Sequence, residues 1–278
     1  VIHQGVADPF KGSPQDAVIE FENKLKHAIA QQMIADVPLG AFLSGGIDST
    51  TVVALMQAQS RQPVKTFTIG FNEEGYNEAE HAKAVAKHLG TDHTELYVTP
   101  EQAREVIPKL PSIYCEPFAD SSQIPTYLVS QLAKTQVTVS LSGDGGDELL
   151  GGYGRYFKAT KLHHKVSQMP ALLRSILPPV MHTLSAKSWN NLLHPLTLIS
   201  GKRLNNGDLG TKIHLAADLL EHGNRSPMDL YRYLLSQWKN PAELVIGSVK
   251  EPLTAFSDRS LQPPLDGQFH QMMALDLI

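Results

Sequence analysis

The sequence predicts an α/β fold, in which a parallel sheet has helices on both faces, followed by a mainly helical region. Three observations predict it. Short apolar or β-branched runs alternate with helical patterns over the first half of the chain. Glycine or serine stands at the ends of three of those runs. Beyond about Tyr156 the strand pattern fades, and prolines punctuate segments rich in Leu, Ala and His. We therefore expect an α/β region over 1–155 and a mainly helical region over 156–278.

A helix is expected at the start of the α/β region, over residues 14–35. Ser13 is suited to be its N-cap, Pro14 takes the first helical position, and Asp16 places an acid in the first turn. One apolar stripe at helical spacing runs along this segment, formed by Val18, Phe21, Leu25, Ile29 and Met33. The stripe marks one apolar face of the helix.

Strands are expected next at 39–43, 64–71 and 137–142, where the runs are apolar or β-branched, and at 93–98, where the residues alternate. Helices are expected between them at 51–59, at 77–89 closed by Gly90, from Pro100 onward and at 123–134. In the second half, helices are expected at 172–177, 216–220 and 230–238. Ligands of parallel sheets sit at the carboxyl ends of the strands. The strand ends at Ser44-Gly45, Gly70 and Ser142-Gly143 should therefore converge on one crevice.

The composition is that of an ordinary globular chain of 278 residues, 42% hydrophobic and 19% charged. A net charge of −4 argues against nucleic acid as a partner. The apolar runs are too short for a membrane span, and the amino end has no signal-peptide pattern. The single cysteine, Cys115, excludes an internal disulfide, fits a reducing cytoplasm, and is expected to be a partly buried apolar residue. Val1 and an unfinished helical pattern at Ile278 indicate a piece of a longer polypeptide.

The first motif with chemical meaning is Leu43-Ser44-Gly45-Gly46-Ile47-Asp48-Ser49-Thr50, between an apolar strand and a helical pattern. A glycine-rich turn at a helix start binds anions, because backbone N–H groups there lack partners and the helix dipole favours negative charge. Asp48 adds a carboxylate that could hold Mg²⁺ beside a phosphate. An ordinary capped turn from strand to helix is the alternative. No lysine follows the glycines, which excludes the common GxxxxGK[ST] loop.

A second motif, Ser142-Gly143-Asp144-Gly145-Gly146-Asp147-Glu148, directly follows the last predicted strand. Its three carboxylates lie within five positions. Such crowding of like charge is costly unless a cation shares the site. Asp147 with Asp48 could complete a Mg²⁺ site on pyrophosphate, and a solvated acidic turn is the alternative. Tyr153 and Tyr156, which follow, could line the crevice or act as packing anchors.

Together, SGGIDS and LSGDGGDELLGGYGRY resemble the synthetase domain of glutamine-dependent asparagine synthetases, within the ATP pyrophosphatase (PP-loop) superfamily. The likeness is dense from about Val37 to Phe157. It includes Tyr76-Asn77-Glu78-Ala79 through His93, and Glu116 through Ser122, where Glu116, Asp120 and Ser121 could face the substrate or form a capped loop. Other SGGxDS enzymes share only the first motif. The resemblance implies an adenine nucleotide α-hydrolase-like fold.

The resemblance also implies roles for individual residues. ATP would be bound by Leu43, Ser44, Gly45, Gly46, Asp48, Ser49, Ile69, Ser142 and Gly143. Asp48 and Asp147 would bind Mg²⁺. Asp144, where the family commonly has Glu, would act catalytically on the acyl-adenylate intermediate. His81, His88 and His93 fit no closed zinc pattern and are expected to be solvated or at strand ends.

The implied reaction is ATP-dependent amide synthesis, with aspartate, ATP and ammonia giving asparagine, AMP and pyrophosphate. In the family, a glutaminase domain of the same full-length chain supplies ammonia. The present sequence has no such domain, and the family's KVDR-like lysine segment would lie beyond Ile278. We therefore expect this piece to be unable to hydrolyse glutamine. Two alternatives remain: an amidotransferase acting on a sugar uronic acid of surface polysaccharide, and a nucleotide-binding module without turnover. The oligomeric state is not readable from the sequence.

Overall fold

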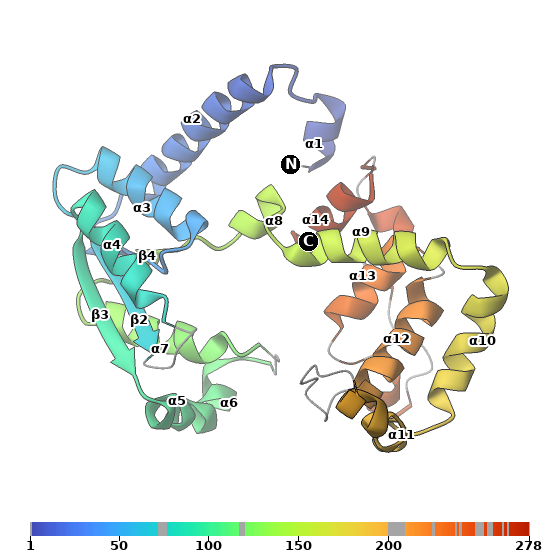
Figure 1. The fold of residues 1–278 in the computed structure, drawn as a ribbon. Coiled ribbons are helices and arrows are strands. Elements are labelled where there is room, and N and C mark those ends of the chain that lie inside the picture. Colours follow the sequence, from blue (N-terminus) through green and yellow to red (C-terminus); the bar gives the residue numbers. More distant parts are fainter. Residues whose placement is uncertain are drawn as a thin grey trace. The chain divides into compact units, whose positions relative to one another are not determined.

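The computed structural model describes residues 2–71, 77–116, 120–199, 209–223, 226–236, 238, 241–247, 253–254, 258–262, 264–265 and 267–277 (Figure 1). Contacts divide the chain into two compact units. One comprises Pro9–Asp147, and the other comprises Val1–Asp8 with Glu148–Ile278. The chain passes from one to the other inside the second motif, between Asp147 and Glu148.

A four-stranded parallel sheet organises the unit Pro9–Asp147, in the order β3-β2-β1-β4. The strands are β1 (Leu39–Phe42), β2 (Lys65–Phe71), β3 (Asp92–Val98) and β4 (Val139–Leu141). Ala41 of β1 is in register with Thr66 of β2 and Leu141 of β4. The parallel sheet predicted from the alternating pattern is therefore confirmed. Strand β1 lies between β2, which contains Gly70, and β4, which is followed by Ser142-Gly143.

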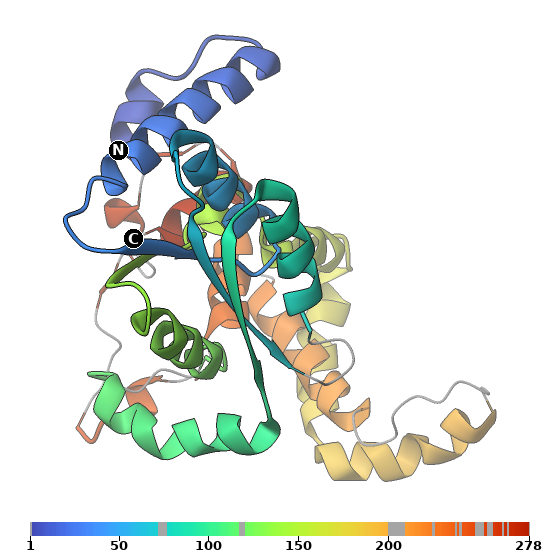
Figure 2. The ribbon, with the colours of Figure 1, turned by 90° about the vertical axis from the view of Figure 1, so that its left-hand side faces the viewer.

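Helices cover both faces of this sheet. The helices of this unit are α2 (Pro14–Gln32), α3 (Ile47–Gln59), α4 (Ala79–Leu89), α5 (Pro100–Val106), α6 (Leu110–Ile113) and α7 (Gln123–Lys134). On one face, residues of α2, α3 and α4 pack around Ala41 and Leu43. On the other, α7 packs against Phe42 and Phe67. Figure 2 shows α4 and α7 on opposite sides of the strands, so the predicted covering of both faces is confirmed.

The capping residues of α2 account for where the helix begins. Part of its apolar stripe is not buried. Ser13 accepts a hydrogen bond from the N–H of Asp16, whose carboxylate accepts one from the N–H of Ser13. The helix ends at Gln32 rather than at residue 35. Ile29 is buried, but Val18 and Phe21 remain 66% and 41% exposed. Only the second half of the predicted stripe therefore packs in this core.

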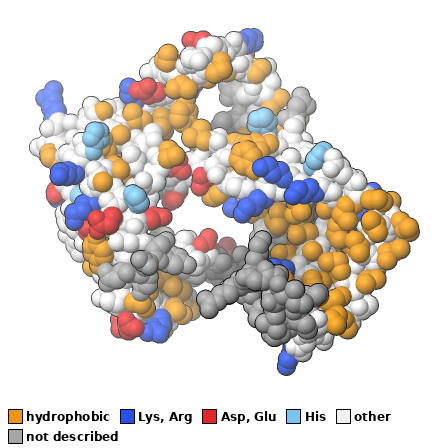
Figure 3. All heavy atoms as spheres, viewed as in Figure 1, with side chains coloured by type: hydrophobic (Ala, Val, Ile, Leu, Met, Phe, Trp, Pro, Cys, Tyr) orange, Lys and Arg blue, Asp and Glu red, His pale blue; other side chains and the backbone are white. Residues whose placement is uncertain are grey.

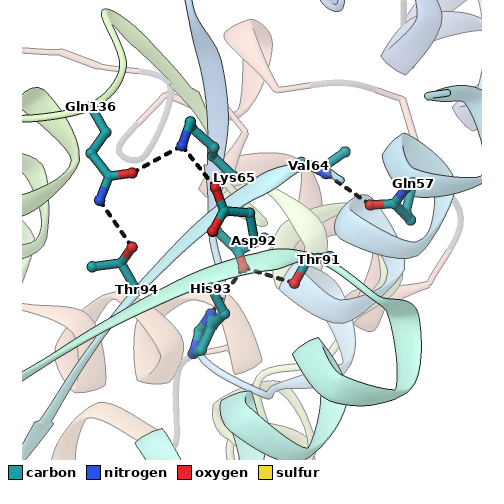
Figure 4. A network of polar contacts seen from close by, with 9 residues as sticks. Gln57, Val64, Lys65, Thr91, Asp92, His93, Thr94 and Gln136 are labelled. Carbon is teal, nitrogen blue, oxygen red and sulfur yellow. Dashed lines mark hydrogen bonds and ion pairs between the residues drawn. The ribbon is translucent and has the colours of Figure 1, made fainter. Parts of the chain in front are cut away.

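Polar side chains fix the amino-terminal end of the sheet (Figure 4). Lys65 Nζ donates to Asp92 Oδ2 at 2.8 Å and to Gln136 Oε1 at 3.1 Å. Thr66 Oγ1 lies 2.9 Å from His93 Nδ1. These contacts join the beginnings of β2 and β3 to the segment before β4. They lie at the opposite end of the strands from the glycine-containing ends, and so help to set the register of the strands.

The second unit is helical in its described residues. It contains α1 (Ile2–Ala7), α9 (Gly154–Ser167), α10 (Ala171–His182), α11 (Ala186–Ile199), α12 (Leu209–Gly223), α13 (Pro227–Leu235) and α14 (Gln268–Asp276), and α8 (Gly146–Leu150) crosses the boundary between units. Short 3₁₀ helices lie at Ile107–Lys109 in the first unit and at Pro241–Leu244 and Arg259–Leu261 in the second. No strand occurs among the described residues after β4, which confirms the mainly helical region.

The core of this unit joins α9, α13 and α14. Tyr156, Tyr231 and Met272 are each 0% exposed and pack in one cluster. Tyr156 is therefore a packing anchor, one of the two interpretations open from the sequence. Among the described residues, no helix is long and apolar enough to cross a membrane.

Helix α10 departs most clearly from expectation. A Pro-Pro pair removes two backbone donors and usually ends a helix, and the sequence predicts a helix only to residue 177. Instead α10 continues through Pro178 and Pro179 to His182, with Pro178 buried. Its other side exposes Leu172, Ile176 and Val180, at 69%, 48% and 48%. Figure 3 shows a broad apolar surface on the helical unit.

Candidate functional site

The first motif forms the connection from β1 to α3. Leu43 is 1% exposed, and its N–H donates to the carbonyl of Phe67 in β2 at 2.9 Å. Helix α3 begins at Ile47 with Gly46 as N-cap, and no side chain caps it among the described residues. Asp48 lies in the first helical turn. The strand, glycine turn and helix start predicted for an anion site are therefore present in that order.

The hydroxyl groups of Ser44 and Ser49 hold the loop in shape. Their Oγ atoms lie 3.0 Å apart. Ser49 Oγ also accepts from the N–H of Ser44 at 3.2 Å and donates to the carbonyl of Gly46 at 3.3 Å. Ser44 is exposed, whereas Ser49 is only 8% exposed. The loop is thus closed internally by hydrogen bonds within the described residues.

The two glycines of the loop differ in how strictly the local structure requires them. Gly45 has a φ of +81°, and a Cβ there would lie 2.7 Å from the backbone nitrogen of Ala82. Gly46 has an ordinary φ of −70°, and a Cβ there would meet only Ser44 Oγ, at 3.3 Å. Gly45 is therefore needed for the fold, while a side chain at Gly46 would require only a small shift of Ser44 Oγ.

The second motif packs directly against the beginning of α3. A Cβ on Gly143 would lie 2.7 Å from the backbone nitrogen of Ser49. A Cβ on Gly146 would lie 2.5 Å from Asp48 Cγ. Only glycine at both positions allows this approach. The two motifs, about one hundred residues apart in the sequence, therefore meet at the carboxyl ends of the strands. This is expected, because each motif directly follows a strand of the same parallel sheet.

The acidic side chains of the second motif differ in environment. Asp144 is exposed, and its Oδ2 accepts a hydrogen bond from Ser142 Oγ at 3.0 Å. Asp147 is half-buried in α8, next to Gly146, which touches the Asp48 carboxylate. Among the described residues, no group of three or more His, Cys, Asp or Glu side chains could hold a metal ion.

A pocket of about 350 Å³ opens beside the first motif. It is mainly apolar, and its walls come from the ends of β1 and β2 and from α7. Its lining residues are Phe42, Leu43, Ser44, Phe67, Thr68, Ile69, Phe71, Glu78, Pro125, Thr126 and Val129. A volume of this size is within the range of small-molecule sites. The sequence singles out Leu43, Ser44 and Ile69, but it does not indicate the wall from α7, although it predicts that helix.

Other predicted candidates lie elsewhere. Asp120 Oδ1 accepts from the N–H of Ser122 at 2.8 Å, and this hydrogen bond is the main cause that lowers the Asp120 pKa. That contact is typical of a capped loop. Residues 117–119 and Tyr76 lie outside the described residues. His81 and His88 are exposed on α4, and His93 lies near the start of β3.

The expectation that Cys115 is partly buried is wrong. Its side chain is exposed and lines a separate pocket, of about 390 Å³, with Tyr114 and Glu116. It lies two residues after the end of the short helix α6, in a segment with no strong apolar period, so surrounding packing rather than residue type decides its exposure.

Comparisons with known proteins agree with the two motifs. The family model described as asparagine synthase matches residues 20–278. A putative asparagine synthetase [glutamine-hydrolyzing] 2 of Methanocaldococcus jannaschii is 42% identical over 161 residues, which is 57% of this chain and 31% of that protein. Asparagine synthetase [glutamine-hydrolyzing] 1 of Bacillus subtilis is 36% identical over 169 residues, covering 61% of this chain and 26% of that protein. These matches span about a third or less of the curated relatives' lengths.

A solved structure, an NH3-dependent NAD synthetase from Campylobacter jejuni, resembles the chain with a TM-score of 0.36 and 12% identity. The match covers 73% of this chain and 95% of that one. A likeness of that degree does not bear on function. The family match rests instead on the sequence over most of the chain, including both motifs. The chain belongs to the asparagine synthase family.

Proposed function

We propose that this chain forms the synthetase part of an ATP-dependent ligase that converts aspartate to asparagine through an acyl adenylate. The observation that carries the proposal is the meeting of the two glycine motifs beside the apolar pocket, at the carboxyl ends of β1 and β2. Nucleotides bind at this edge of parallel sheets. The asparagine synthetase relatives support the choice of chemistry.

In this proposal, the adenosine of ATP lies in the pocket between Leu43 and Ile69. The phosphates lie at the start of α3, where the backbone of Ser44 through Ser49 and the helix dipole favour negative charge. Ser142 and Gly143 complete the ATP contacts. Gly46 has no Cβ, so a phosphate could approach its backbone closely.

Asp48 and Asp147 would hold Mg²⁺ together with pyrophosphate oxygens. Their placement fits that donor set, because Gly146 brings the second motif against the Asp48 carboxylate. When bound, Mg²⁺ would neutralise the charge of the departing pyrophosphate. Asp144 is exposed beside Ser142, where it could contact the activated carboxyl group.

The reaction consists of two displacements. A carboxylate oxygen of aspartate attacks the α-phosphorus of ATP, and the bond to pyrophosphate breaks. Ammonia then attacks the acyl carbon, and AMP leaves with the carboxylate oxygen while the nitrogen loses a proton. Both steps develop negative charge, which the N–H groups at the start of α3 would stabilise. Glutamine, as the ammonia source in the full-length protein, belongs to the same proposal.

Binding of intermediate analogues tests this function without depending on turnover. We expect a non-hydrolysable aspartyl-adenylate analogue to bind at least about 100-fold more tightly than AMP, as measured by calorimetry. A glucuronyl-adenylate analogue serves as the comparison. Tighter binding of the glucuronyl analogue would favour the sugar-amidating alternative. Equal affinity for AMP and both analogues would leave a nucleotide-binding module and overturn the proposed ligase.

A further inference from the structure

Asp276, at the end of α14, is a buried carboxylate at the centre of a hydrogen-bond network. Its side chain is 7% exposed. Asp276 Oδ2 accepts hydrogen bonds from Arg155 at 2.6 Å, from the hydroxyl of Tyr156 at 2.7 Å and from that of Tyr231 at 2.6 Å. Arg155 Nε also donates to the Tyr231 hydroxyl at 3.1 Å. One oxygen atom thus joins α9, α13 and α14.

The three groups that donate to Asp276 keep their protons. Burial and the hydrogen bond to Asp276 raise the pKa values of Tyr156 and Tyr231, so both phenols remain donors. Burial disfavours the charged form of Arg155, but its bonds with Asp276 and Tyr231 raise its pKa above the ordinary value. Well-packed apolar residues in place of a buried ion pair often stabilise a fold as much as the ion pair does. Stability alone is therefore a weak explanation for a charged pair here.

The network extends from Arg155 to the second motif. The Arg155 guanidinium carbon lies 3.5 Å from the centre of the Tyr153 ring. The Tyr153 hydroxyl in turn donates to Glu148 Oε1 at 2.6 Å. A continuous path of contacts therefore leads from Asp276 through Arg155 and Tyr153 to Glu148, which directly follows Asp147 in helix α8.

Helix α8 needs outside support to keep its position. It has five residues, too few to be stable alone. Leu149 and Leu150 are both 60% exposed, so apolar burial anchors it little. Gly151, at its end, packs so closely on α14 that a Cβ would lie 2.8 Å from Phe269 Cε1. The contacts of Glu148 and Gly151 therefore tie α8 to the elements around Asp276.

We propose that Asp276 is a positioning residue for the nucleotide site. By holding Arg155, and through it Tyr153 and Glu148, it fixes the helix that carries Asp147. Asp276 acts through these side chains and is assigned no contact with substrate or metal. The inference rests on the proposed function, in which Asp147 holds Mg²⁺ against pyrophosphate. It adds a specific consequence: a residue of α14 affects the Mg²⁺ concentration that pyrophosphate binding requires.

The test measures the Mg²⁺ concentration needed for half-maximal pyrophosphate binding by this chain. Tyr153→Phe removes the hydroxyl that holds Glu148 but keeps the ring against Arg155. Asp276→Asn weakens the network at its centre. We expect each change to raise the required Mg²⁺ concentration about tenfold, since groups that orient a metal ligand have effects of this size. The double variant should be little worse than either single variant, because both act through Glu148.

Tyr233→Phe is the matched control. The Tyr233 hydroxyl donates to Asp218 Oδ2 at 2.6 Å in the same unit, and so provides an equivalent tyrosine–carboxylate bond. We expect it to leave the Mg²⁺ requirement unchanged, even if it lowers the melting temperature. Adenosine affinity, which needs no metal, should remain the same in every variant.

The outcomes separate the two proposals. If the unmodified chain does not bind Mg²⁺ and pyrophosphate, the proposed function fails and the role of Asp276 fails with it. If the chain binds but Tyr153→Phe behaves like Tyr233→Phe, the positioning role alone is wrong. Should Asp276→Asn not fold, as judged by circular dichroism, Tyr153→Phe decides the matter, because it leaves all three bonds to Asp276 in place.

Discussion

Two pairs of residues determine the candidate site. Gly143 and Gly146 lie against Ser49 and Asp48, so that a side chain on either glycine would collide with the start of α3. Sequence motifs alone predict these four positions, because each motif is local. The bond from Arg155 to Asp276 joins residues 121 positions apart and could not be predicted in the same way. Nothing in the local pattern of either residue identifies the other.

The paired carboxylates give a prediction at this scale. If Asp48 and Asp147 hold one Mg²⁺, Asp48→Asn and Asp147→Asn should each weaken Mg²⁺-dependent pyrophosphate binding. In the double variant, the losses should fall short of additivity by about 0.5–3 kcal/mol, because the second change acts on a metal already lost. Calorimetry on the single and double variants measures this. The exposed Asp36 provides the control, as Asp36→Asn; additive losses for Asp48 and Asp147 would show separate roles.

At the scale of elements, the sequence predicts strands and caps better than helix packing. The capping residues of α2 and the C-cap Gly90 of α4 act locally, and both are where the pattern predicts them. Packing is not local. Two of the five residues of the α2 stripe, Val18 and Phe21, stay exposed. Helix α10 packs against α12 and continues through Pro178 and Pro179.

The stability of the chain should depend on pH through His93, near the start of β3. Burial lowers the pKa of His93 from 6.5, with Glu95 opposing and Lys83 adding to the shift. The unfolded chain therefore binds the proton more readily. The contribution of neutral His93 to stability is complete above its unfolded pKa and is lost as the pH falls toward its folded pKa.

Thermal unfolding at about pH 7.5 and about pH 5 measures this effect. We expect the melting temperature of His93→Gln to fall less on acidification than that of the unmodified chain. His88→Gln, at an exposed position of α4, is the control and should behave like the unmodified chain. If the melting temperature of His93→Gln falls as much on acidification as that of the unmodified chain, other groups cause the acid sensitivity.

At the scale of the whole molecule, the two units differ in how far the sequence explains them. In Pro9–Asp147, alternating strands and helices predict the sheet, its parallel direction and the edge that carries the motifs. In the helical unit, the sequence predicts the class but not α9, α11 and most of α12, since prolines and scattered leucines leave the helical period weak. The proposed function therefore rests on the first unit, and the positioning role of Asp276 on the second.

The most direct test of the central claim is the affinity of this chain for Mg·ATP, compared with Gly46→Val. Because Gly46 has an ordinary φ and a Cβ there would meet only Ser44 Oγ, at 3.3 Å, valine should fill the phosphate position after a shift of a few tenths of an ångström at Ser44. Gly5→Val controls for the added side chain, because a Cβ on Gly5 would have no heavy atom within 4 Å. We predict that Gly46→Val weakens Mg·ATP binding about a hundredfold, or about 2.7 kcal/mol, and leaves adenosine binding unchanged. Undiminished Mg·ATP affinity in folded Gly46→Val would contradict the account.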